Sequence, residues 1–252
     1  MLTGVFVTIG VLISILPAIY GRSYPISWAT PFVFIGLVIL LNYLINERRT
    51  AERELAMCKI SAQLGFSYSH TPPSPLIAHL NVIKRGLGEK RFDLNKTKNV
   101  MTGRFNNRHV AVFDHTYTVE VGSSSVTERE TIFLVISDKL NLPNLQIEEG
   151  RGGFMGNALI ELFGTRDIRF SDRPDFTKKY QLHGGDEATL RRIFTPQIIK
   201  FYEDEYPLQT LAGGNLLCIF LPRESEEAST FNEIQTWLNG LMRLHDLFAQ
   251  VR

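Results

Sequence analysis

Three side chains that could bind a metal ion lie close together in the sequence: His109, Asp114 and His115. Histidine and carboxylate ligands suit zinc or iron. The segment from 110 to 118 is rich in β-branched and aromatic residues and predicts a β-strand. Because side chains alternate along a strand, the two histidines share one face about 20 Å apart, and Asp114 points to the other face. We therefore interpret all three as structural residues and predict no metal site.

A glycine-rich segment at 150 to 156, Gly-Arg-Gly-Gly-Phe-Met-Gly, precedes a short predicted helix. Backbone amides before a helix N-terminus can bind phosphate. The spacing, however, matches neither GxGxxG nor the P-loop, whose Lys and Ser/Thr are missing, so a flexible loop is the better interpretation. Three consecutive acids, Glu203 to Glu205, could attract a divalent cation, yet an acidic run at a helix end usually forms a solvated surface.

Sequence signatures of catalysis are missing. The chain has no GxSxG nucleophile elbow, no HExxH and no kinase motif, and neither cysteine has an adjacent histidine that would activate it. Cys58 and Cys218 are far apart and outside any CxxC spacing, which argues against a disulfide framework and a zinc site. We interpret both as small buried hydrophobic residues. The sequence thus predicts a protein that is not an enzyme, with no catalytic residues and no cofactor.

Positive charge is concentrated between residues 84 and 108, although the whole chain carries a formal charge of only +1. One interpretation is an ordinary solvated surface. The other is contact with anionic lipid headgroups, to which each Lys or Arg near a membrane surface contributes about 1 kcal/mol. A nucleic-acid partner is disfavoured because the overall charge is nearly neutral and aromatic residues are sparse in this stretch. The residues assigned to this membrane-surface contact are Lys84, Arg85, Lys90, Arg91, Lys96, Lys98, Arg104 and Arg108.

The elements that would position these residues begin with two apolar segments. Residues 1 to 20 contain no charged side chain, and about 20 apolar residues at about 1.5 Å each cross a hydrocarbon core of roughly 30 Å. Residues 28 to 45 form a second apolar run with Trp28 and Tyr43 near its ends, and residues 21 to 27 have the composition of a turn. The sequence therefore predicts a transmembrane helical hairpin over 1 to 45. A cleaved signal peptide is disfavoured because the segment begins without Lys or Arg.

Charge placement predicts the orientation of this hairpin. Arg48, Arg49 and Arg53 follow the second apolar run, whereas only Arg22 lies between the two runs. By the positive-inside rule, both termini are predicted to be cytoplasmic in a multi-pass membrane protein.

The remaining chain predicts a helical stalk over 46 to 65 and a cytosolic α+β domain over 66 to 252. Gly65 is a natural end for the stalk helix. Runs at 110 to 118 and 131 to 136, with Gly122 and three serines between them, predict an antiparallel hairpin in a mainly antiparallel sheet, preceded by a strand near 99 to 105. A capping box at 230 to 233 starts a long C-terminal helix. Its apolar stripe is expected to bury Trp237, Leu241 and Phe248.

Several short motifs in this order resemble a family of uncharacterised bacterial membrane proteins, a domain of unknown function behind two N-terminal transmembrane helices. The resemblance covers most of the chain. It implies anchoring in a bacterial inner membrane and supplies no catalytic residues. The motifs are Leu64-Gly65-Phe66, Val112-Phe113-Asp114 with Tyr117, Leu142-Pro143, Asp167-Ile168, Pro174-Asp175-Phe176 with Tyr180, and Ile193-Phe194.

Two functions follow as expectations. The first is a membrane-anchored, non-enzymatic protein whose cytosolic domain binds a protein partner or a second copy of itself, or senses the membrane surface. The alternative is a membrane-tethered hydrolase or ligand-binding enzyme that uses the loop at 150 to 156 and the acids near Glu203. In both, the lipid bilayer is a partner and nucleic acid is not.

Overall fold

The computed structural model describes residues 30–87, 92–121, 124–149, 166–204, 209–222 and 230–251. The chain divides into two compact units, Met1–Arg53 and Glu54–Arg252. One helix, α2 (Thr30–Leu64), crosses the division. It ends before Gly65, whose φ of 69° is the left-handed conformation that closes helices without a Cβ penalty.

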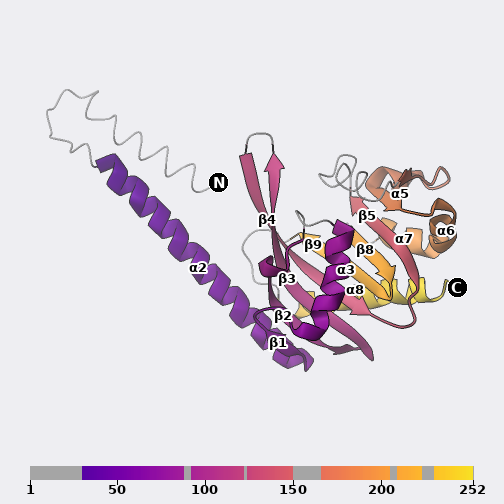
Figure 1. Cartoon of the computed structure of the whole chain (residues 1–252), viewed down its shortest axis with the longest axis horizontal. Helices are drawn as coiled ribbons and strands as arrows, with labels where there is room; N and C mark the ends of the chain where they lie inside the picture. The colour runs from indigo at the N-terminus through magenta and orange to yellow at the C-terminus, as the bar shows by residue number, and fades with distance from the viewer. Residues whose placement is uncertain are drawn as a thin grey trace. The chain divides into compact units, whose positions relative to one another are not determined.

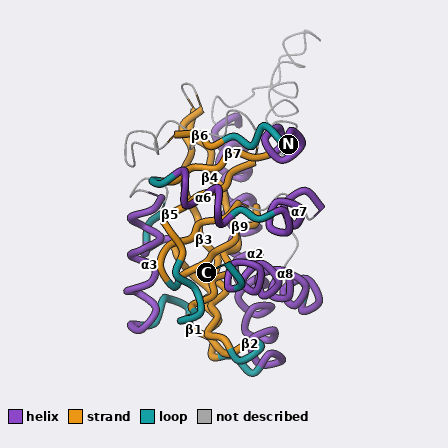
Figure 2. Tube along the Cα trace, turned by 90° about the vertical axis from the view of Figure 1, so that its right-hand side faces the viewer, coloured by secondary structure: helices purple, strands orange, loops and turns teal. Residues whose placement is uncertain are grey.

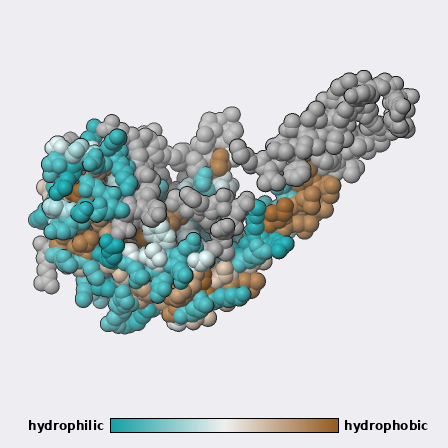
Figure 3. All heavy atoms as spheres, turned by 180° about the vertical axis from the view of Figure 1, so that it is seen from behind, coloured by the Kyte–Doolittle hydropathy of each residue, from teal (hydrophilic) through white to brown (hydrophobic). Residues whose placement is uncertain are grey.

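In the first unit the structure describes α2 up to Arg53. The uninterrupted apolar run from Phe32 to Leu41 is about 15 Å long at about 1.5 Å per residue, half of a hydrocarbon core of roughly 30 Å. Asn42 interrupts the run, and Asn46 to Arg49 follow a few residues later. Large apolar side chains between Ile35 and Ile45 are exposed, and Figure 3 shows apolar surface gathered beside hydrophilic surface on this helix. No helix within the described ranges is both long and apolar enough to cross a membrane.

The predicted transmembrane hairpin over 1 to 45 is therefore wrong. Its second crossing, at 28 to 45, does not reach the required combination of length and apolarity where the helix is described. The first crossing, at 1 to 20, and the turn at 21 to 27 lie outside the described residues. The predicted multi-pass location in a bacterial inner membrane, with both termini cytoplasmic, rested on this hairpin and falls with it.

The second unit is built on a nine-stranded antiparallel sheet with the strand order β1-β2-β3-β4-β9-β8-β5-β7-β6 (Figure 1). The strands are β1 (Ser67–Ser69), β2 (Thr97–Phe105), β3 (Arg108–Val121), β4 (Ser124–Ile136), β5 (Leu142–Glu149), β6 (Arg166–Ile168), β7 (Tyr180–Gly184), β8 (Gln209–Gly214) and β9 (Leu216–Pro222). The helices are α3 (Ser74–Leu87), the 3₁₀ turn η1 (Leu94–Lys96), α5 (Pro174–Lys179), α6 (Glu187–Ile193), α7 (Pro196–Asp204) and α8 (Phe231–Ala249).

Helices cover both faces of this sheet. Alternation along β3 sends Val110 and Val112 into a core shared with α5 to α8, and sends Ala111 and Phe113 into a second core under α3. Figure 2 shows α3 on one side of the strands and α7 and α8 on the other. Burial on both faces explains why the central strands read as nearly continuous apolar runs.

The predicted hairpin is confirmed as β3 and β4, which pair antiparallel from His109–Ile136 to Val121–Ser124. The strand predicted before it is β2. Asn106 and Asn107 connect β2 to β3 with φ values of 48° and 63°. Two consecutive positive φ values are those of a type I′ turn, for which asparagine is a favoured residue.

Close packing at β2 requires one particular glycine. A Cβ added at Gly103 would overlap the ring of Phe66. The absence of a side chain at 103 lets this aromatic ring lie against the strand backbone.

Helix α8 begins as predicted. The Thr230 hydroxyl accepts from the Glu233 amide at 3.3 Å, and the Glu233 carboxylate accepts from the Thr230 amide at 2.6 Å. Leu241 and Phe248 are buried, which confirms that part of the stripe, whereas Trp237 is only partly buried.

Replacing Leu241 by Ala is expected to lower the free energy of unfolding by about 2 to 5 kcal/mol, because it empties space in a packed core. Urea denaturation would measure the loss. Asn239→Ala, at an exposed position on the same helix, is the control and is expected to change stability by less than about 0.5 kcal/mol. Equal effects at the two positions would show that α8 is peripheral to the core.

The two cysteines differ in burial, whereas the sequence predicted that both are buried. Cys218 on β9 is buried, and burial raises the pKa of its thiol. Cys58 on α2 is exposed, so its predicted burial is wrong.

A thiol reagent such as iodoacetamide is therefore expected to modify Cys58 in the native protein and to modify Cys218 only after unfolding, because the reagent needs an accessible thiolate. Mass spectrometry of the labelled peptides, with and without urea, would measure this order. Native labelling of Cys218 at the rate of Cys58 would contradict the buried position of β9.

Candidate functional site

The β3–β4 hairpin continues beyond the rest of the sheet. Strand β2 pairs with β3 only as far as His115, and β9 pairs with β4 only as far as Glu130. Beyond these two residues, Thr116–Val121 and Ser124–Arg129 pair only with each other among the described residues. We call this two-stranded segment the arm; Figure 1 shows it projecting from the sheet.

The arm is exposed. Thr118 and residues 125 to 129 are exposed, and Val126 retains 43% of its accessible surface. Thr116 and Tyr117, next to the sheet, are half-buried. A two-stranded ribbon is at best marginally stable by itself, so the arm depends on how its base is held.

One buried polar cluster holds the base of the arm on the face that carries α8. Asp114 accepts hydrogen bonds from the Asn99 amide at 3.0 Å and from the Thr131 hydroxyl at 3.0 Å. The Tyr68 hydroxyl donates to Asn99 Oδ1 at 2.9 Å. Asn99 has a φ of 52° and lies where the β2–β3 register shifts, between Lys98 and Met101. This bulge turns the asparagine side chain toward the carboxylate.

A second buried cluster holds the base on the opposite face. The Asp93 backbone amide donates to His115 Nε2 at 3.2 Å, so Nδ1 carries the ring hydrogen and faces Glu130 Oε1 at 3.3 Å. The imidazole is fully buried and stacks on Phe92 with ring centroids 4.4 Å apart. Both ring nitrogens are thus engaged, and His115 is a structural residue.

These contacts separate the three residues that suggested a metal site. Asp114 and His115 point to opposite faces, and His109 lies on the exposed part of β3, where its Nε2 is 3.1 Å from Arg104. Within the residues described, no group of three or more histidine, cysteine or acidic side chains could hold a metal ion.

A third polar cluster escaped the sequence prediction. Gln146, Glu148 and His183 are buried on β5 and β7, and the Gln146 amide donates to Glu148 Oε1 at 2.7 Å. Gln146 lies directly opposite His183 in the ladder. Their apolar neighbours Leu145, Ile147 and Leu182 point into the other face. The alternation of polar and apolar residues along β5 can be recognised in the sequence. Such alternation normally predicts that the polar side chains face water, so the burial of this cluster was not predicted.

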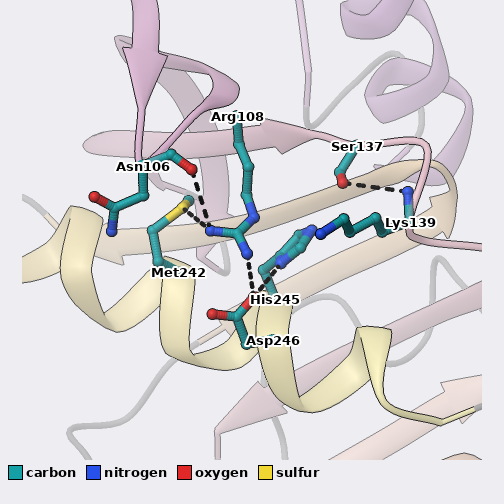
Figure 4. Close-up of polar contacts among 7 residues, drawn as sticks. All are labelled: Asn106, Arg108, Ser137, Lys139, Met242, His245 and Asp246. Atoms are coloured by element: carbon teal, nitrogen blue, oxygen red, sulfur yellow. Dashed lines mark hydrogen bonds and ion pairs between the residues drawn. The ribbon is translucent and has the colours of Figure 1, made fainter.

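A clamp joins α8 to the start of β3 (Figure 4). The Arg108 guanidinium donates to the carboxylate of Asp246, contacts the sulfur of Met242 at 3.8 Å and reaches the backbone carbonyl of Asn106 at 3.5 Å. The side chain of Arg108 is 19% exposed and that of Asp246 is 50% exposed. The ion pair therefore lies at the rim of the core, where only the arginine is largely desolvated.

Those basic residues assigned to a membrane surface that the structure describes do not form one patch. Arg104 contacts Asn107 and His109 on one face of the sheet, whereas Arg108 is engaged with α8 on the other. Lys84 and Arg85 lie in the last turn of α3, Lys96 in η1 and Lys98 on β2; Lys90 and Arg91 are outside the described residues. Their contact with anionic headgroups stays a prediction.

The residues considered for an enzyme fall mostly outside the part of the chain that the structure describes. The loop at 150 to 156 and Glu205 lie outside the described residues. Asp204 forms an exposed ion pair with Lys200 at 2.8 Å, and this pair raises the pKa of the lysine ammonium.

Comparison with known proteins finds weak structural similarity and no match to a protein family or a curated protein. No protein-family model matches the chain, and no curated protein matches it. Among solved structures, a match is the crystal structure of the mycobacterial trehalose monomycolate transport factor A, TtfA, with a TM-score of 0.46 and 11% sequence identity over 79% of this chain and 93% of that chain. The likeness is too weak to carry a functional conclusion. Membership of the uncharacterised family suggested by the short motifs stays a prediction.

The cluster around Asp114 generates a stability prediction. Asn99→Gly keeps the positive φ accessible but removes both side-chain hydrogen bonds, and we expect a loss of about 1 to 3 kcal/mol because a buried carboxylate loses a donor. Asn106→Gly is the matched control at a second positive φ, with no cluster around it, and should change stability by less than about 0.5 kcal/mol. Urea denaturation of the two variants would measure the difference. Similar small effects in both would mean that the cluster does not stabilise the fold.

Proposed function

We propose that this chain is a non-enzymatic, partner-binding protein and that the arm is the element that binds. The observation that carries the proposal is the extension of the β3–β4 ladder past both neighbouring strands, from Thr116 and Arg129 outward. A strand edge without a neighbour presents a row of backbone N–H and C=O groups. Such an edge is complementary to an extended polypeptide segment, which adds to it as a further strand.

The composition of the arm supports this proposal. Proteins commonly protect exposed edges with proline, with lysine or with a covering element. The arm sequence, from Thr116 to Arg129, contains neither proline nor lysine and is rich in threonine and valine, which favour strands. The arm thus has the composition of a strand that pairs, and it lacks the proline and lysine residues that commonly keep an exposed strand edge from pairing.

The construction of the base also supports the proposal. Asp114 and His115 are consecutive residues, and their buried clusters hold the ribbon from both faces at the place where β2 and β9 stop pairing. A base that is held from both faces restricts the motion of the arm, and this reduces the conformational entropy that is lost when a partner strand binds.

The hydrolase alternative has less support. Of the residues that it would use, the loop at 150 to 156 lies outside the described part of the chain, and Asp204, beside Glu203, is already paired with Lys200.

The test is a chain with a shortened arm. Tyr117 and Glu128 are directly opposite in the ladder, so replacing residues 118 to 127 by Asn-Gly gives a two-residue hairpin turn that keeps the register. We expect this variant to keep its urea midpoint and to lose complexes with its partner, because Thr118 and residues 125 to 127, the described side chains among those removed, are exposed and belong to neither core.

Binding would be measured with a photo-crosslinking amino acid at Thr127 in the full-length chain, expressed in its native cells. Irradiation should give crosslinked complexes from Thr127 and none from the control position Asn239, exposed on α8. An untouched complex in the shortened variant, detected by co-purification, would refute the role of the arm.

A further inference from the structure

The geometry around His245 points to a pH-sensitive latch: His245, Asp246, Arg108 and Lys139 fasten the C-terminal turns of α8 at neutral pH and release them in mild acid. This inference concerns α8 and is independent of the role proposed for the arm. The four residues come from three places, namely α8, the start of β3 and the connection between β4 and β5.

The hydrogen bonds fix the charge state in which the latch is closed. Asp246 Oδ1 accepts from the Arg108 guanidinium and lies 2.9 Å from His245 Nδ1. Because a carboxylate only accepts, Nδ1 carries the hydrogen of the neutral ring, and Nε2 carries a lone pair. The side chain of His245 is fully buried, and Nε2 has no hydrogen-bond partner among the described residues.

Positive charge surrounds this lone pair. Figure 4 shows the Lys139 side chain extending toward the imidazole from the β4–β5 connection, with the Arg108 guanidinium also near the ring. Protonation would place a third cation in this space and would bury a charged N–H with no acceptor. Within the described ranges only Asp246 opposes that cost, and it is already shared with Arg108.

The balance of these effects favours the neutral ring. Burial is the largest cause and lowers the pKa of His245; the Asp246 hydrogen bond raises it, and the charges of Arg108 and Lys139 lower it further. The folded pKa is therefore below the value of about 6.5 expected for an unfolded chain. The stabilising contribution of the neutral ring is complete above that unfolded value and is lost as the pH falls below it, because the unfolded state then binds the proton more readily.

The consequence is a local opening. Leu241 and Leu244 keep the middle of α8 in the core. His245 is followed by Asp246, by Phe248, which packs in the same core, and by the exposed Gln250 at the end of the helix. When the imidazole is protonated it leaves its buried position, and the turns from 245 onward lose the contact that ties them to β3.

Hydrogen exchange of the full chain, monitored by mass spectrometry at pH 7.5 and 5.5 and corrected for intrinsic exchange rates, tests the latch. Protection of peptides within 242 to 251 is expected to fall by up to about tenfold, because pH 5.5 lies about one unit below the unfolded pKa of about 6.5, while protection of α3 peptides stays constant. His245→Gln should abolish the pH dependence of the 242 to 251 peptides. His109→Gln, which changes an exposed histidine on β3, should behave like the unmodified chain.

A second measurement does not depend on the His245 variant folding. In Lys139→Gln, at an exposed position, removal of a neighbouring cation should raise the pKa of His245 in an NMR titration of the ring and should reduce the loss of protection at pH 5.5. A pH-independent exchange of 242 to 251 in the unmodified chain, or an unchanged His245 titration in Lys139→Gln, would overturn the latch.

Discussion

Antiparallel pairing of β3 with β4 is the interaction on which the rest of the second unit depends. Every other strand joins the sheet through one of these two: β2 and β1 through β3, and β9 with the remaining strands through β4. The same pairing divides the apolar residues of the two strands between the two cores. A failure of this hairpin would therefore leave both layers of helices without a surface to pack on.

The register of that pairing is determined unusually strictly. In most half-buried strands a slip by one residue exchanges apolar and polar faces, whereas here both faces are apolar over residues 110 to 113. Asp114 and His115 distinguish the two faces of β3, because the hydrogen-bond partners of each side chain lie on one face only. A slipped strand would bring a carboxylate to Phe92 and Glu130 and an imidazole to Asn99, with few of the hydrogen bonds retained. Buried polar residues thus specify a position that apolar residues alone would leave ambiguous.

How far the sequence could predict this structure differs from element to element. The β3–β4 hairpin and α8 were readable because their signals are local: β-branched runs around a glycine and serine turn, and a capping box from Thr230 to Glu233. The transmembrane hairpin was wrong because an apolar run was judged by composition, without regard to its interruption at Asn42. The buried polar clusters were missed because burial of Gln146 or His183 depends on which distant element covers that face. Nothing within their own strands carries that information. Arg108 was assigned to a membrane surface, whereas its partner Asp246 is distant in sequence and meets it only after α8 has folded back.

The packing of Gly103 against Phe66 constrains how this protein can change over time. A side chain at 103 has no room while an aromatic ring occupies position 66, and a smaller residue at 66 would leave a cavity while 103 remains glycine. Neither position can therefore drift independently of the other. In homologous chains these two positions should covary: a larger side chain at 103 should occur together with a smaller one at 66. The segment after α2 and strand β2 are therefore expected to evolve together.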